Sequence, residues 1–521
     1  MKENRGGTEV LTLSEAARYI RVSEKTLGEM ARQNRIPCQK AGREWRFLKK
    51  ALEDWLHSSP DNGKNEHNIE QRSRKISARD YKQGELFEDT GFKDTAFYKN
   101  VSSPLHRWVP WIAGFSSSFV EGVLESVVGN GKKITLLDPF AGVGTTLVEG
   151  MKNGHNVVGF EINPYAYLAC RVKLNAADLR VKDLNQEIVS FKRFMDKKSS
   201  GNASPRSEIP AKFKTRSRFF SPSVERKVLF VLDYIASMDA LHLKDLFRVA
   251  LGAVMVGFSN YSYEPSLGRR VSAGKEEIRD ADVAGIMINK LEQMKEDILY
   301  LQEHFSSRKA NPEVSLYKEN FLKSADKLDK RSIDCLITSP PYLNNYHYIR
   351  NTRPQLYWLG LAESSDDLKS LEHDSFGKFW QTVRSSPEIE LKVKSAPLES
   401  ALEKIREQNQ DRGVYGGPGW ANYAATYFND CADFFQSISR LMKKKGTAVI
   451  VVGNNILQGI EIKSDEIMAD ISKSYGFETA RFHRVRTKRT GTSIINSSVR
   501  AGVSKKKTEL YETALELVFK G

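Results

Sequence analysis

Residues 132–161 have the sequence KKITLLDPFAGVGTTLVEGMKNGHNVVGFE, which carries the strongest structural signal in the chain. The apolar run ITLLD is typical of a buried strand, and a turn containing Gly142 and Gly144 follows it. TTLVEGMKNG then predicts a helix, and NVVGFE predicts a second buried strand that ends in Glu161. Strand, glycine turn, helix, strand and acid in this order predict a Rossmann-like α/β domain, in which the backbone of the turn approaches a nucleotide cofactor.

The chain has 521 residues, which is enough for two to four domains of ordinary size. Hydrophobic residues make up 40% and charged residues 28%, which favours a folded protein over a disordered one. We expect a cytoplasmic protein without a membrane partner, because no uncharged apolar stretch reaches the roughly 20 residues of a membrane span and the N-terminus has no apolar signal core. The four cysteines form no CxxC pair, so we expect neither disulfides nor a metal site.

Charge points to a polyanionic partner. Lysine and arginine number 80 and aspartate and glutamate 65, which gives a formal net charge of +15. Such an excess of positive charge usually indicates that a protein binds nucleic acid. The alternative is that the proteins of the same organism are basic in general.

A change of composition near residue 60 divides the chain. The segment His57–Lys75 has one apolar side chain, Ile69, so it cannot bury a core. We therefore expect an N-terminal domain over residues 8–57, a linker over 58–92 and a large domain over 93–521.

The N-terminal domain has the pattern of a helix-turn-helix. LSEAARYI predicts a helix capped by Ser14, SEKTLGEMARQNRI predicts a second helix capped by Ser23, and a hairpin turning at Gly42 and a short third helix, ALEDWL, follow. These words, with RIP and GREWRF, resemble the excisionase-type, MerR-related winged helix-turn-helix. The resemblance implies that the second helix enters the major groove of DNA, and the alternative is a winged helix that contacts protein. The implied DNA contacts are Lys25, Arg32, Arg43 and Arg46.

DPFAGVGTT, residues 138–146, resembles motif I of the amino-methyltransferases that use S-adenosyl-L-methionine. The resemblance implies that this cofactor binds rather than NAD, with its ribose on Glu161. LHRWVPWIAGFSSSFVEG, from Leu105, is similar to the helix that cradles the methionine end, although its aromatic residues also fit a core. VSLYKEN, from Val314, is similar to the segment that contacts adenine. The implied cofactor-binding residues are Asp138, Phe140, Gly142, Gly144, Thr145, Glu161, Asn163, Asn320, Trp108, Phe115 and Ser116.

Another apolar run, DCLIT, ends in the tetrapeptide SPPY. At the end of a buried strand, SPPY resembles the catalytic motif of DNA methyltransferases that act on exocyclic amino groups. The lone pair of such an amine is delocalised into the ring, so acceptors at its two hydrogens are needed to direct it at the methyl sulfonium. The resemblance implies that the serine side chain and the first proline carbonyl are these acceptors, and that the tyrosine stacks on a base flipped out of the duplex. The implied catalytic residues are Ser339, Pro340, Pro341 and Tyr342.

Later segments complete the sheet and offer surfaces for DNA. The resemblance implies a seven-stranded sheet with one antiparallel strand, which GFETARFHRV and ETALELVF would supply. Two insertions, 213–307 and 362–423, are candidates for reading the target. We expect the first to be mostly helical and the second to be a mobile loop, and the residues do not choose between them. Residues 481–507 contain nine lysines and arginines and no acid, which predicts a flexible loop that contacts phosphates. The predicted contacts there are Arg484, Arg486, Lys488 and Arg489.

Together the motifs predict a DNA methyltransferase that acts on the exocyclic amine of a flipped base in double-stranded DNA. In the family that SPPY resembles, serine in place of aspartate at the first catalytic position favours cytosine N4. Adenine N6 stays open because serine and aspartate both accept from the amine. Methylation of structured RNA and a DNA-binding regulator with an inert methyltransferase fold are further alternatives. No nuclease motif is present, so any restriction endonuclease partner would be a separate chain.

Overall fold

The computed structural model separates the chain into two compact units, residues 1–82 and 83–521. The division falls within the stretch expected to be a linker. No helix in the described part of the chain is long and apolar enough to cross a membrane. The structure describes residues 10–20, 22–32, 36, 38–41, 44–48, 97–111, 114–128, 132–199, 203–263, 266–305, 312–343, 347–488 and 510–521.

The N-terminal unit packs two helices on a small antiparallel sheet with the strand order β1-β3-β2. Its elements are β1 (Val10–Thr12), α1 (Leu13–Tyr19), α2 (Glu24–Arg32), β2 (Gln39–Ala41) and β3 (Glu44–Leu48). The first strand was not predicted, because three residues are too few for a periodic pattern. Apolar side chains from both helices and the sheet form one core, made by Leu11, Ala16, Ala17, Leu27, Ala31, Ile36 and Phe47.

The helix caps of this unit differ in part from the prediction. Thr12, not Ser14, caps α1: its hydroxyl accepts the Glu15 N–H at 3.3 Å, and the Glu15 carboxylate accepts the Thr12 N–H at 2.8 Å. This reciprocal capping box starts the helix one residue before Ser14, which therefore lies inside it. The second predicted cap is confirmed, because the Thr26 N–H donates to Ser23 Oγ at 3.0 Å. The predicted third helix, ALEDWL, lies outside the described residues.

The large unit is built on a seven-stranded, mostly parallel sheet, as expected for an α/β domain. The strand order is β13-β14-β10-β9-β4-β5-β8. β14 alone runs antiparallel to both of its neighbours, β10 and β13, while the central pairs are parallel. The strands are β4 (Thr135–Asp138), β5 (Asn156–Phe160), β8 (Val314–Tyr317), β9 (Ile333–Thr338), β10 (Met442–Gly453), β13 (Phe477–Lys488) and β14 (Leu510–Phe519).

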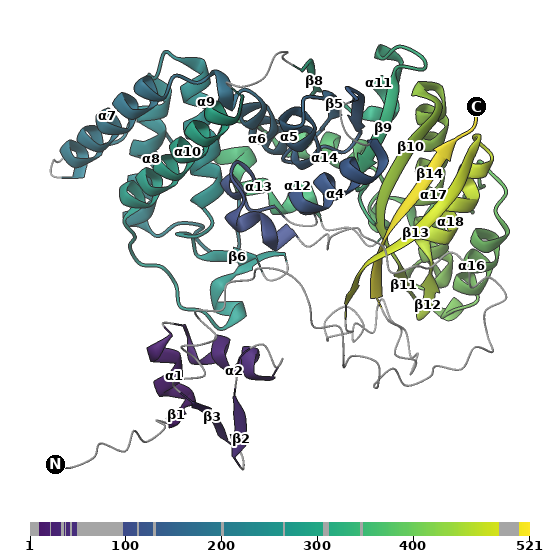
Figure 1. Cartoon of the computed structure of the whole chain (residues 1–521), viewed down its shortest axis with the longest axis horizontal. Helices are drawn as coiled ribbons and strands as arrows, with labels where there is room; N and C mark the ends of the chain where they lie inside the picture. Colours follow the sequence, from purple (N-terminus) through teal and green to yellow (C-terminus); the bar gives the residue numbers. More distant parts are fainter. Residues whose placement is uncertain are drawn as a thin grey trace, which may run out of the picture. The chain divides into compact units, whose positions relative to one another are not determined.

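Helices cover both faces of this sheet (Figure 1). Leu136 and Ile337 belong to one core, and Leu137 and Leu336 belong to the other, because successive residues of a strand point to opposite faces. Both faces are therefore buried, which explains why these strands are continuous apolar runs in the sequence. The first core includes α4 (Ser117–Val128), α5 (Thr145–Lys152) and α6 (Pro164–Leu174), and the second includes α17 (Gly417–Leu441) and α18 (Ser464–Lys473).

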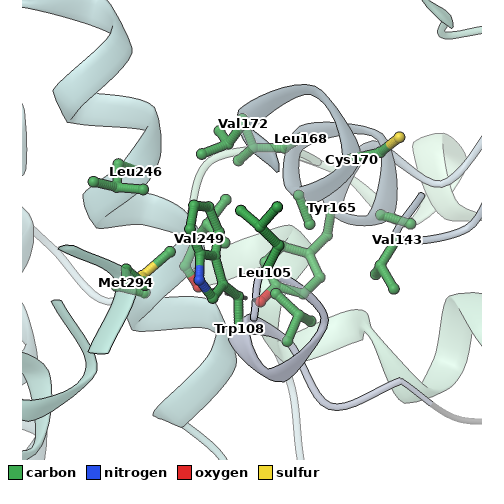
Figure 2. Packing of buried hydrophobic residues seen from close by; sticks show 14 of the residues in the cluster. Leu105, Trp108, Val143, Tyr165, Leu168, Cys170, Val172, Leu246, Val249 and Met294 are labelled. Atoms are coloured by element: carbon green, nitrogen blue, oxygen red, sulfur yellow. Dashed lines mark hydrogen bonds between the residues drawn. The ribbon is translucent and has the colours of Figure 1, made fainter. Parts of the chain in front are cut away.

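The first insertion is helical, as predicted, and it extends the first core. Figure 2 shows Trp108 packed against Leu246 and Val249 of α9 and Met294 of α10, beside α6. These helices share buried side chains with the sheet, so they are part of the same folding unit. Helix α7 (Val181–Ser199) precedes the insertion. Within the insertion lie α8 (Pro222–Ser237), α9 (Leu241–Val254) and α10 (Val283–Phe305).

The second insertion is folded, which corrects the expectation of a mobile loop. It contains α14 (Ser365–Asp374), α15 (Trp380–Val383) and α16 (Ala396–Arg406) and leads into α17. The apolar residues of α16, Leu398, Leu402 and Ile405, follow a helical period and are buried in the second core. Short helices separated by glycine and proline obscured this period in the sequence.

The basic segment also begins differently from the prediction. Residues up to Lys488 belong to β13, which pairs with β14 over its whole length. The expected flexible loop is therefore wrong for residues 481–488, because their backbone pairs with β14 in the sheet. Residues 489–509 lie outside the described part of the chain.

Asp297 of α10 fastens the segment that precedes α4. Its carboxylate is 1% exposed in the folded unit and accepts the Leu105 N–H at 2.8 Å, Trp108 Nε1 at 2.9 Å and Arg107 Nη2 at 2.6 Å. Leu105 has a φ of 64°, a conformation that an ordinary side chain adopts only when its surroundings hold it.

We predict that Asp297→Ala lowers the free energy of unfolding by about 3–5 kcal/mol, because it leaves a half-buried guanidinium and two buried N–H donors without their acceptor. Urea unfolding of the full chain measures this loss. Glu296→Ala is the control. Glu296 is 69% exposed and its carboxylate lies 3.5 Å from the same arginine, so losing this surface ion pair lowers the free energy of unfolding by less than about 1 kcal/mol. Equal effects of the two substitutions would contradict the prediction.

Candidate active site

A cavity with about 1140 Å³ of space, part of it open to solvent, lies at the carboxyl ends of β4, β5, β8 and β9. The chain runs outward from β4 through β5 to β8 and then returns past β4 to β9, so the strand order reverses here. Ligands of open α/β sheets bind at such a reversal. Many of the residues predicted from the sequence line this cavity: Phe115, Asp138, Phe140, Gly142, Thr145, Glu161, Asn163, Asn320, Ser339 and Pro341.

The two glycines of the loop between β4 and α5 serve different purposes. Gly142 has a φ of 52°, and a Cβ there would lie 3.2 Å from Trp111 Nε1 at the cavity wall. Gly144 has a φ of 87° and caps α5, and a Cβ there would lie 2.6 Å from Cys170 Sγ of α6. Gly144 does not line the cavity. The positive φ and the close packing against α6 both require glycine at this position.

Two carboxylates stand at the ends of β4 and β5. Glu161 accepts the Gly142 N–H at 2.8 Å and the Asn163 N–H at 2.6 Å. Asp138 accepts the Thr338 hydroxyl at 2.6 Å and the Phe140 N–H at 3.1 Å. Burial raises the pKa of Glu161 to about 7 and that of Asp138 to about 6, although these donors oppose the shift.

The two asparagines of the cavity wall are helix caps. Asn163 Oδ1 accepts the Tyr165 N–H at 3.0 Å, and its Nδ2 donates to Thr352 Oγ1 at 2.8 Å. Asn320 caps α11 (Phe321–Ser324), and its Nδ2 donates to the Asp374 carbonyl at 2.7 Å. Each amide therefore has a structural role besides its place at the cavity.

The segment before α4 places its aromatic residues differently from the prediction. The helix expected from Leu105 begins only at Ser117, after a short 3₁₀ turn, η2 (His106–Trp108). As a result Trp108 is fully buried in the core, and Ser116 is buried as well, accepting the Phe119 N–H at 3.2 Å. Neither lines the cavity, whereas Trp111 does. Because the helix begins later in the chain than predicted, a different face of this segment meets the cavity.

Residues of the second insertion form a cavity wall that no motif indicated. They run from the end of α14 to the start of α15. Phe376 packs edge-on against Phe140 of the glycine loop, with 5.0 Å between ring centroids. Only the tertiary fold brings this wall to the site, so the sequence held no local signal for it. The wall residues are Asp374, Ser375, Phe376, Gly377 and Phe379.

The SPPY turn follows β9 directly. Ser339 and Pro341 line the cavity, while Pro340 is buried. The Tyr342 ring packs against the end of β10, where a Cβ on Gly453 would lie 3.3 Å from Tyr342 Cε2. Burial holds the pKa of Tyr342 well above its usual value, so its hydroxyl stays neutral.

The predicted basic contacts are placed only in part. The Arg484 guanidinium lies 3.4 Å from the ring centroid of Tyr511, and Arg486 lies 4.0 Å from the Glu512 carboxylate. Arg46 donates to the Trp45 carbonyl at 3.1 Å. Lys25 and Arg32 belong to α2 and Lys488 ends β13, while Arg43 and Arg489 lie outside the described residues.

Metal ligands are not gathered at this site: across the described ranges, no cluster of three histidine, cysteine or carboxylate residues could hold an ion.

The chain matches a family model at its N-terminus and known methyltransferases over most of its length. Residues 10–59 match a family model described as a helix-turn-helix domain, which confirms that prediction. The chain is also 24% identical to the type II methyltransferase M.BsoBI of Geobacillus stearothermophilus, over 77% of this chain and 84% of that protein. It is 24% identical to M.AvaI of Nostoc sp. (81% and 88% covered) and 22% identical to M.MvaI of Kocuria varians (80% and 88% covered), both also type II methyltransferases.

We predict that the buried Glu161 makes stability fall with rising pH. Its pKa is about 7 when folded and 4.5 in an ordinary setting, so the folded chain holds a proton that the unfolded chain releases. The free energy of unfolding therefore decreases between these pH values, by about 3 kcal/mol in total.

Urea unfolding of wild type and Glu161→Gln at pH 5 and pH 8 measures this effect. The wild type should lose more stability than the variant as pH rises. The exposed Glu296→Gln should behave as wild type. Equal pH dependence of wild type and Glu161→Gln would refute the assignment.

Proposed function

We propose that this chain is a DNA methyltransferase that transfers a methyl group from S-adenosylmethionine to the exocyclic amino group of a flipped base, with cytosine N4 favoured. The observation that carries the proposal is that Glu161, after β5, and Ser339, after β9, line one cavity although 178 residues separate them. The similarity to type II methyltransferases supports methyl transfer, and the helix-turn-helix domain supports DNA as the substrate.

The cavity suits S-adenosylmethionine, which supplies a methyl group on a sulfonium when bound. Each Glu161 oxygen accepts one backbone N–H, and a carboxylate oxygen has a further lone pair for a ribose hydroxyl. The carboxylate of Asp138 is a candidate for the cofactor's ammonium group. Trp111, Phe115 and Phe376 offer apolar surface for the adenine and the methylene groups.

The SPPY turn would prepare the acceptor amine. The Ser339 side chain and the Pro340 carbonyl accept its two hydrogens and turn its lone pair toward the methyl group. Pro341 restricts the backbone of the residue before it, which favours an extended conformation at Pro340. No thiol nucleophile is required, and burial raises the pKa of the nearby Cys335 to about 12, so that thiol is inert.

DNA would be held by both units. We propose that Lys25, Arg32, Arg43 and Arg46 of the helix-turn-helix contact one DNA segment, and that the basic residues from Arg484 to Arg489 contact phosphates near the target. A separate restriction endonuclease that cuts the same sequence is the partner that this activity suggests.

We predict that the purified chain labels unmethylated bacterial DNA with the methyl group of isotopically labelled S-adenosylmethionine. After digestion to nucleosides, mass spectrometry should find the label on N4-methylcytosine. Label on N6-methyladenine would keep the mechanism and overturn the choice of base. Label on added RNA alone, or no label while the cofactor binds, would overturn the proposal.

Ser339→Ala should reduce methyl transfer at least about 100-fold, because it removes an acceptor that acts on the amine in the transition state. The Kd for S-adenosylmethionine, measured by calorimetry, should stay within about twofold of wild type. Ser332→Ala is the control: its hydroxyl contacts the Asp329 carbonyl at the opposite end of β9. Full activity of Ser339→Ala would show that the catalytic assignment is wrong.

A further inference from the structure

A second cavity lies beside the first and shares two of its wall residues, Trp111 and Tyr348. It holds about 630 Å³ of space. The rings of Trp111 and Tyr348 are nearly parallel, with 6.3 Å between their centroids. Tyr165 of α6 and Tyr263 of β6 (Tyr261–Tyr263) add two more aromatic walls. The space is therefore framed mainly by flat, polarisable surfaces.

Two buried amides face this aromatic frame from the α12–α13 region. Asn351 ends α12 (Tyr348–Asn351), Gln355 lies in α13 (Arg353–Trp358), and they are 4% and 5% exposed. Asn351 Oδ1 accepts the Leu267 N–H at 3.0 Å, and Gln355 Nε2 donates to the Gly252 carbonyl at 3.1 Å. The other amide atoms, Asn351 Nδ2 and Gln355 Oε1, have no hydrogen-bond partner in the described structure.

A buried polar atom without a partner destabilises the folded chain, so such atoms on residues that line a cavity indicate a ligand that pairs with them. Here one donor and one acceptor remain, on residues four apart in the sequence. None of the described residues that line this cavity is charged. A phosphate group or the amino-acid part of a cofactor would find no opposite charge, whereas a neutral heterocycle fits.

We propose that this second cavity holds a nucleobase of the DNA substrate other than the base being methylated. Every base has a hydrogen-bond donor or amine next to a ring or carbonyl acceptor on its pairing edge, which matches Gln355 and Asn351. Stacking on aromatic side chains stabilises a bound base of any kind, because every base has a flat face. Ser339 lines the first cavity and not the second, so a base held here keeps its amine away from the catalytic turn.

Besides the two shared rings, one hydrogen bond between side chains connects the walls of the two cavities. Thr352, which lines the second cavity, accepts a hydrogen bond from Asn163, which lines the first. A base bound to the second cavity would thus press on the same wall that holds the cofactor. This places recognition of a neighbouring base next to methyl transfer. The inference rests on the proposed function, since that function supplies the DNA.

Saturation-transfer NMR on the full chain tests this site. The protein is first saturated with S-adenosylhomocysteine, which occupies the first cavity, and each of the four deoxynucleosides is then added separately. We expect transfer to the base protons of at least one deoxynucleoside. The signal should be lost in Gln355→Met and in Asn351→Asp, and kept in Gln186→Met, an exposed glutamine of α7.

Asn351→Asp keeps the oxygen that accepts the Leu267 N–H and replaces the unpartnered donor with a second oxygen, and binding of S-adenosylhomocysteine shows whether the variant is folded. Both variants should bind S-adenosylhomocysteine within about twofold of wild type and lose about tenfold in kcat/KM for DNA.

No transfer to any nucleoside, or a signal that both variants keep, would overturn the inference. Wild-type protein that methylates DNA under the same conditions would leave the proposed function standing in either case. Wild-type protein that methylates no DNA would instead remove the proposed function and the basis of the inference with it.

Discussion

Two of the turns at the carboxyl ends of the sheet strands depend on the carboxylate of Glu161. One oxygen holds the Gly142 N–H of the glycine loop after β4, and the other holds the Asn163 N–H at the start of α6. Two loops that follow different strands are thereby fixed to one buried acid. Burying this acid costs free energy and raises its pKa, and the two short hydrogen bonds offset part of that cost. The cavity takes its shape from this junction.

The insertions are part of the site rather than additions to a finished domain. α10 of the first insertion supplies Asp297, which holds the segment leading to Trp111 and Phe115. The second insertion supplies the wall around Phe376. Both therefore shape the first cavity through packing and hydrogen bonds, and target recognition would have to use other surfaces of the same elements. The second cavity, bordered by β6 of the first insertion, is the surface that we propose for a neighbouring base.

Much of the sheet and the cavity could be predicted from the sequence, because buried parallel strands are continuous apolar runs and the residues after them meet at one edge. Glu161 and Ser339 were found in this way. Trp111 was missed in favour of Trp108, since the 3₁₀ turn that contains Trp108 is held by Asp297, 189 residues away from Trp108. Gly144 and Asn320 were recognised from local motifs. The structural reasons for these two residues are tertiary contacts, with Cys170 and with Asp374. The wall at Phe376 had no local pattern.

The central claim is that one cavity brings the cofactor at Glu161 to the catalytic turn at Ser339. A crystal structure of the full chain with S-adenosylhomocysteine tests it most directly. We predict that the ribose hydroxyls contact the Glu161 carboxylate and that the sulfur faces Ser339 and Pro340. A ligand bound outside this cavity, or one whose sulfur points away from the SPPY turn, would contradict the account.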